Sequence, residues 1–171
     1  MNTGSLPFDD ETQLYCNFGL HGWNDLIVFK DGEAQVFSVT DVFTDFASEI
    51  LEICRAVLEN TSLRVALCDE PGGVVFEVCR DKQQQHTMLL SIYEIERPLF
   101  GFSANETGKL VLTSRLRRQR LIEMLIAELW KTHISLKHRS FSDHRRVFPN
   151  RDLVELNALW HESSLGPSFL K

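Results

Sequence analysis

A switch between two hydrophobic periods constrains this sequence more than any other feature. In the first forty residues short apolar runs are separated by glycine-containing turns, which is typical of strands joined by tight connections. Asp31-Gly32 lies between two such runs and predicts a tight hairpin turn, because both residues tolerate positive φ. The expected strands cover 14–18, 25–29 and 35–39.

The period becomes helical at residue 41. Between 41 and 59 one side of a helical wheel is apolar and the other charged, which predicts an amphipathic helix. We expect Thr40 or Asp41 to cap its start and Asn60 to end it in a left-handed conformation. The predicted buried face comprises Val42, Phe43, Phe46, Ile50, Ile53, Cys54, Val57 and Leu58.

Strand-like and helical runs then follow once more. Pro71-Gly72 favours a turn with positive φ at the glycine, and a long helix is expected over 115–137. A last short helix, capped by Asn150, would carry Leu153, Leu156, Leu159 and Trp160. The expected strands of this half cover 63–68, 74–79, 87–95 and 109–112.

This order predicts an α+β fold. Short turns between most strands favour a mainly antiparallel sheet of six to seven strands, with the two main helices on one face and a short C-terminal helix. The 171 residues, 43% hydrophobic and 25% charged, suit a single domain, 1–171. We expect residues 1–12 to form a flexible leader and 140–150 an irregular connection.

Cysteine usage and hydropathy predict a cytoplasmic location. The four cysteines are widely spaced within apolar segments, which is typical of reduced, buried thiols. Cys68 and Cys79 could still face each other across a hairpin as a redox pair. No apolar run approaches the roughly 18 residues of a membrane span, and the first residues lack the pattern of a signal peptide.

Charge is distributed unevenly along the chain. Residues 1–108 carry 6 Lys/Arg against 18 Asp/Glu, whereas 109–151 carry 11 against 3. The expected start of the long helix holds four arginines that oppose the helix dipole, so an anionic partner could bind there. A net charge of −6 counts against nucleic acid, and pairing with acids of the same domain is the simpler interpretation. These arginines are Arg115, Arg117, Arg118 and Arg120.

Catalytic motifs are absent from the sequence, so an enzyme would have to assemble its site from distant residues. The best local candidate is His21 on a glycine-flanked turn, with Asp25 or Asp69 as its acid-base partner. Trp23 beside it could provide a stacking surface. An ordinary polar turn is the competing interpretation.

Metal and cofactor binding are not expected. Asp69 and Glu70 form an acidic hairpin tip without nearby His or Cys, which favours a solvated turn over a metal site. His133 and His138 point about 140° apart around the expected helix, so they cannot share a zinc ion, and His144 lies beyond it.

Aromatic residues in the expected connections point to recognition of another macromolecule. They are Trp23, Phe100, Phe102, Phe141 and Phe148. Such residues either close the ends of a core or mark an interface.

The segment 14–95, from Trp23-Asn24-Asp25-Leu26 through the helix to Asp69-Glu70-Pro71-Gly72-Gly73, resembles bacterial proteins with an Asp/Glu-Glu-Pro-Gly hairpin. Some of these are immunity-type proteins paired with toxins. The resemblance implies a protein partner but transfers no functional residue.

We therefore expect a non-enzymatic, protein-binding module, with Trp23, Asp69 and Glu70 facing a basic partner. The alternatives are a small enzyme using His21, anion or nucleic-acid binding through the arginines, and a self-associating subunit.

Overall fold

The computed structural model describes residues 6–96 and 101–167 and confirms an α+β fold with seven antiparallel strands. The strands form two sheets rather than the predicted single one. The first sheet has the order β1-β2-β3 and the second the order β4-β5-β6-β7. Their bounds are β1 Gln13–Phe18, β2 Trp23–Lys30, β3 Glu33–Thr40, β4 Leu63–Asp69, β5 Gly72–Arg80, β6 Thr87–Ile95 and β7 Lys109–Arg117.

The sheets separate where helix α1, Phe46–Glu59, joins β3 to β4. Two strands joined by a hairpin turn pair with each other. Strands β3 and β4 are joined by a helix instead, so β4 need not pair with β3 and lies in the second sheet. Asp31 and Gly32 adopt positive φ in the β2–β3 turn, and Gly72 does so as the first residue of β5, as predicted.

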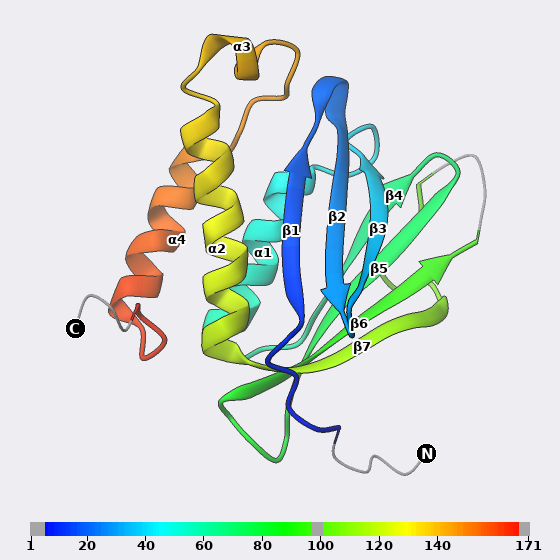
Figure 1. The fold of residues 1–171 in the computed structure, drawn as a ribbon, viewed down its shortest axis with the longest axis vertical. Helices are drawn as coiled ribbons and strands as arrows, with labels where there is room; N and C mark the ends of the chain where they lie inside the picture. Colours follow the sequence, from blue (N-terminus) through cyan, green and yellow to red (C-terminus); the bar gives the residue numbers. More distant parts are fainter. Residues whose placement is uncertain (1–5, 97–100, 168–171) are drawn as a thin grey trace.

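Helices α1, α2 (Arg118–Ser135) and α4 (Asn150–Glu162) lie together beside the strands, and the short α3 (Arg139–Ser142) lies beyond the end of α2 (Figure 1). Helix α1 packs on β4, β5, α2 and α4, while α2 packs on β1 and β7. The helices thus bridge the two sheets and share one hydrophobic core with both.

Helix α1 begins at Phe46, five residues later than predicted. Asp45 is its N-cap and accepts a hydrogen bond from the Ser48 N–H (3.0 Å). Val42 and Phe43, predicted to be buried, lie in the preceding turn and are 61% and 42% exposed. Asn60 ends the helix with φ 55°, as predicted.

The boundary between β7 and α2 also differs from the prediction. Strand β7 continues to Arg117, because Ser114 and Leu116 still pair with Leu90 and Met88 of β6. Arg115 and Arg117 therefore lie on a strand and not in the first turn of a helix. A strand that alternates small polar and apolar residues is hard to separate in sequence from the helix that follows it.

The C-terminal helix is present, but its predicted N-cap is wrong. Pro149 occupies the N-cap position instead of Asn150. Leu153, Leu156 and Trp160 are buried, whereas Leu159 is 49% exposed because it lies about 100° from Trp160 around the helix.

All four cysteines are free, and three are buried. Burial raises the pKa of Cys16 and Cys54, as expected of thiols in an apolar core. Cys68 stands opposite Gly73 and Cys79 opposite Leu89, so the predicted redox pair does not form.

The described part of the expected leader, residues 6–12, lies against β7. Phe8 makes a parallel bridge with Arg115, and Thr12 is buried. Two other predictions fall outside the described residues. They concern residues 1–5 of the leader and the loop aromatic Phe100.

Candidate binding surface

The outer face of the β1-β2-β3 sheet exposes a row of large apolar side chains. Tyr15, Ile27 and Val36 stand directly opposite one another on the three strands. Tyr15 is 41% and Val36 58% exposed, and Phe29 and Trp23 on β2 are 40% and 51% exposed. We call these five residues the outer sheet face.

The opposite side of the same sheet explains this exposure. Leu14 and Cys16 on β1 and Leu26 and Val28 on β2 are buried in the core. Because side chains alternate in a strand, their neighbours must point away from the helices. An antiparallel sheet with one free side normally carries polar residues there, so the large apolar side chains of the outer sheet face make it a candidate interface.

Sequence reasoning identified only Trp23 of this surface. The missed signal is the unbroken apolar run Leu26-Ile27-Val28-Phe29. In a strand with one buried face every second residue should be polar, so this run indicates a second apolar face.

An acidic recess adjoins the outer sheet face along β3. Val36 and Ser38 form one wall, and Asp69, Glu94 and Glu96 approach from the other sheet around about 320 Å³ of space. Within residues 6–96 and 101–167 none of these three carboxylates joins an ion pair, although Lys109 stands opposite Glu94 in the strand register. Glu70 is exposed on the same turn as Asp69.

The structure does not bring the predicted acid-base residues together. Asp25 accepts hydrogen bonds from Asn17 (3.0 Å) and Ser38 (3.3 Å) across the outer sheet face. His21 lies in the β1–β2 turn, where its backbone N–H donates to the His144 carbonyl (2.7 Å). Asp69 lies at the β4–β5 turn of the other sheet.

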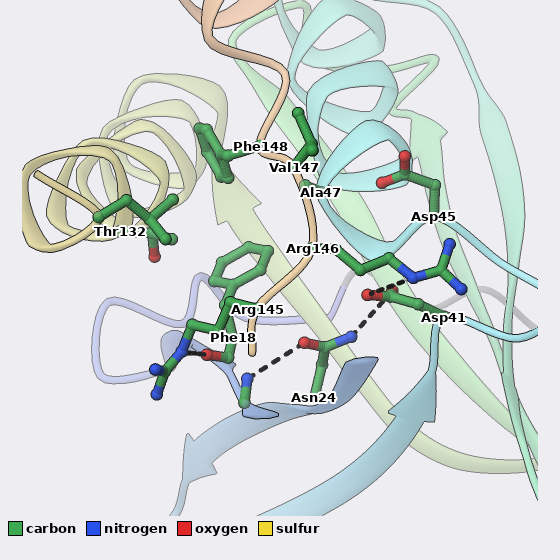
Figure 2. A pocket seen from close by; sticks show the side chains of 12 residues that line it. Phe18, Asn24, Asp41, Asp45, Ala47, Thr132, Arg145, Arg146, Val147 and Phe148 are labelled. Carbon is green, nitrogen blue, oxygen red and sulfur yellow. Dashed lines mark hydrogen bonds and ion pairs between the residues drawn. The ribbon is translucent and has the colours of Figure 1, made fainter. Parts of the chain in front are cut away.

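A partly enclosed cavity beside the β1–β2 turn is too small for a substrate. It holds about 20 Å³, room for one water. Figure 2 shows the network beside it, in which Asn24 donates to Asp41 (2.9 Å) and Arg146 pairs with the same carboxylate (3.8 Å). This network fixes the β1–β2 turn to the segment before α4, and we assign it a structural role.

The four predicted anion-binding arginines do not converge on one surface. Arg118 donates to the carbonyls of Val57 and Leu58 and so satisfies the C-terminal end of α1 (2.7–2.9 Å). Burial lowers the pKa of Arg118, as it does for a cation held among backbone groups. Arg120 donates to the Thr12 carbonyl (3.1 Å), and Arg117 is exposed near Asp10 (3.6 Å).

Arg115, the fourth of these arginines, forms a buried ion pair with Asp81. Its guanidinium donates to the Asp81 carboxylate at 2.5 and 2.9 Å, and the two side chains are 7% and 10% exposed. Burial alone would raise the pKa of Asp81, but hydrogen bonds from Thr87, the Gln83 N–H and Arg115 outweigh it and lower that pKa to about 2. This arginine is unavailable to an external anion.

Asp9 plays a similar role in the leader. Burial opposes its ionisation, but donors from Thr12, Ser114 and the Glu11 N–H lower the pKa of Asp9 to about 2. Its backbone N–H donates to the Arg115 carbonyl (3.0 Å). Residues 6–12 are thereby attached to the free edge of β7.

The loop aromatics serve the core more than a surface. Phe148 is buried edge-on against Phe18 (5.8 Å between ring centroids), and Phe141 lies under the Arg145 guanidinium at 3.7 Å. Phe102 is half-buried, with its carbonyl near the Cys68 sulfur (4.0 Å). Only Trp23 among the described members of the predicted set belongs to the outer sheet face.

Metal-ligating groups of three or more are absent from residues 6–96 and 101–167. His133 contacts the Asn150 amide oxygen (2.6 Å), which accounts for its position at the edge of the helices. In the same part of the chain no helix has the length and hydropathy needed to cross a membrane.

Comparison with protein-family models, with curated proteins and with solved structures returned no match.

Proposed function

We propose that this protein is a non-enzymatic binding module that recognises a basic surface of a partner protein through the outer sheet face. The observation that carries the proposal is the exposed row Tyr15–Ile27–Val36, extended by Trp23 and Phe29, on a sheet whose other side is already in the core. Aromatic residues of this kind are enriched in the centres of protein interfaces.

Charge complementarity supports a basic partner. Asp25 lies on β2 between Trp23 and Ile27 of the outer sheet face, and Asp69, Glu94 and Glu96 line the recess beside Val36. Such a rim attracts positive charge and speeds association, while the apolar centre supplies most of the affinity. A toxin neutralised by an immunity-type protein is one partner with these properties, in line with the resemblance of segment 14–95.

Site-specific photo-crosslinking tests this proposal in cells. A photoreactive residue at Val36 should give a discrete protein adduct, whereas one at Val154, which is 56% exposed on α4, should not. The purified partner should then bind the wild type in a salt-sensitive manner and lose binding to Val36→Glu but not to Val154→Glu. Equal adducts from both positions, or a partner that binds Val36→Glu normally, would contradict the proposal.

A further inference from the structure

Two histidines from distant parts of the chain lie side by side at the β1–β2 turn. The rings of His21 and His144 are 5.1 Å apart between centroids, with their planes inclined by 33°. The His21 N–H donates to the His144 carbonyl at 2.7 Å, which fixes one backbone against the other. Both side chains are exposed, so an ion can reach them from solvent.

The spacing of the rings fits a single tetrahedral metal ion. A zinc–nitrogen bond of about 2 Å places each ring centroid about 3 Å from the ion, and a tetrahedral angle then separates the centroids by about 5 Å. The observed separation agrees with this value. Imidazole is a preferred ligand of Zn²⁺, Ni²⁺ and Cu²⁺, and not of Mg²⁺.

The backbone holds both histidines in an uncommon conformation. His21 has φ 57° and His144 φ 62°, whereas most residues without a glycine's freedom avoid positive φ. Local strain of this kind persists where surrounding contacts impose it, and it recurs at ligand-binding positions. Here the turn is held by two backbone hydrogen bonds, from the His21 N–H to the His144 carbonyl (2.7 Å) and from the Asp41 N–H to the Gly22 carbonyl (2.8 Å).

The neighbouring charges leave room for a cation. Arg145 donates to the Phe18 carbonyl (2.7 Å) and covers the Phe141 ring, so its guanidinium is engaged by other groups. Arg146 pairs with Asp41, which offsets its charge. Asp143, next to His144 in the chain, is exposed.

We propose that His21 and His144 form a two-histidine site for a divalent transition-metal ion such as Zn²⁺, with water completing the coordination. The ion would link the β1–β2 turn, which leads directly into Trp23, to the segment between α3 and α4. With two protein ligands the site binds more weakly than a closed structural zinc site of four. The inference is independent of the proposed partner.

Calorimetric titration of the purified protein with Zn²⁺ alone tests the site. One ion should bind per chain, and either His21→Gln or His144→Gln should abolish it, while the matched control His161→Gln, an exposed histidine on α4, should bind as the wild type does. Mg²⁺ should give no heat of binding. Zinc should also raise the melting temperature of the wild type and leave that of both site variants unchanged.

Histidine ring resonances provide a second readout that does not depend on affinity differences between variants. In the wild type Zn²⁺ should shift the signals of His21 and His144 and leave those of His133 and His161 in place. Zinc binding that survives in both site variants, shifts spread over all the histidines, or no binding to the wild type would each overturn the proposal.

Discussion

Replacing Asp81 by asparagine tests the buried ion pair that anchors β7. The substitution preserves shape but removes the charge facing Arg115, whose guanidinium stays protonated and is only 7% exposed. The lowering of the Asp81 pKa from 3.8 to about 2 corresponds to about 2 kcal/mol of stability at neutral pH. Removing one partner of a buried pair costs roughly 3–5 kcal/mol in other proteins, so we expect a loss of about 2–4 kcal/mol.

Urea unfolding at pH 7 measures this loss. With a denaturant slope of about 2 kcal/mol/M, the unfolding midpoint should fall by about 1–2 M while the slope stays constant. Asp10→Asn is the matched control, because Asp10 and its partner Arg117 are both more than half exposed. That variant should change stability by no more than about 0.5 kcal/mol.

The pH dependence of the same difference separates charge from packing. Because the folded pKa of Asp81 lies below its unfolded value, its ionisation stabilises the protein above the unfolded pKa, and this contribution disappears as the pH falls toward 2. Roughly half should be lost by about pH 3. The stability difference between wild type and Asp81→Asn should shrink accordingly. A difference below about 1 kcal/mol at pH 7, or one that does not change with pH, would refute the role assigned to the pair.

Three further measurements address other parts of the structure. Asp45→Ala removes the N-cap of α1 and should lower the free energy of unfolding by about 1 kcal/mol, whereas Asp45→Asn should restore most of it; equal losses would contradict the cap. Arg118→Met leaves the last carbonyls of α1 without a donor and should cost about 2 kcal/mol in urea unfolding, and an unchanged midpoint would argue against that assignment. In native thiol labelling Cys79, the only half-buried cysteine of the four, should react first although burial raises its pKa too, and Cys79→Ser should remove the fastest phase.

Local side-chain chemistry determined the elements of this protein. The short apolar runs of 14–39, the helical period that follows and the residues Asp31-Gly32 and Asn60 each act within a few positions of the chain. Period and turn chemistry need no information about distant residues, so they predict strands, helices and hairpins correctly.

The exact ends of helices and strands were harder to predict from the sequence, because neighbouring polar residues are equally suited to cap a helix. Asp41 and Asp45 both accept from the start of α1: Asp45 accepts from the Ser48 N–H (3.0 Å), and Asp41 accepts from the Phe46 N–H (3.1 Å) and from Asn24 on β2 (2.9 Å). The sequence pattern predicted Arg115 to be helical. It lies on a strand because β7 pairs with β6 at this position.

Tertiary structure alone decided which residues meet. The residues around Asp81 do not predict its ion pair with Arg115, and those around His21 do not predict its contact with His144. The members of each pair are distant in sequence and meet only when the whole chain is folded. The split into two sheets, and with it the free side of β1-β2-β3, follows from where α1 packs. The sequence specifies apolar periods, but the partner of each face is set by the packing of the whole core.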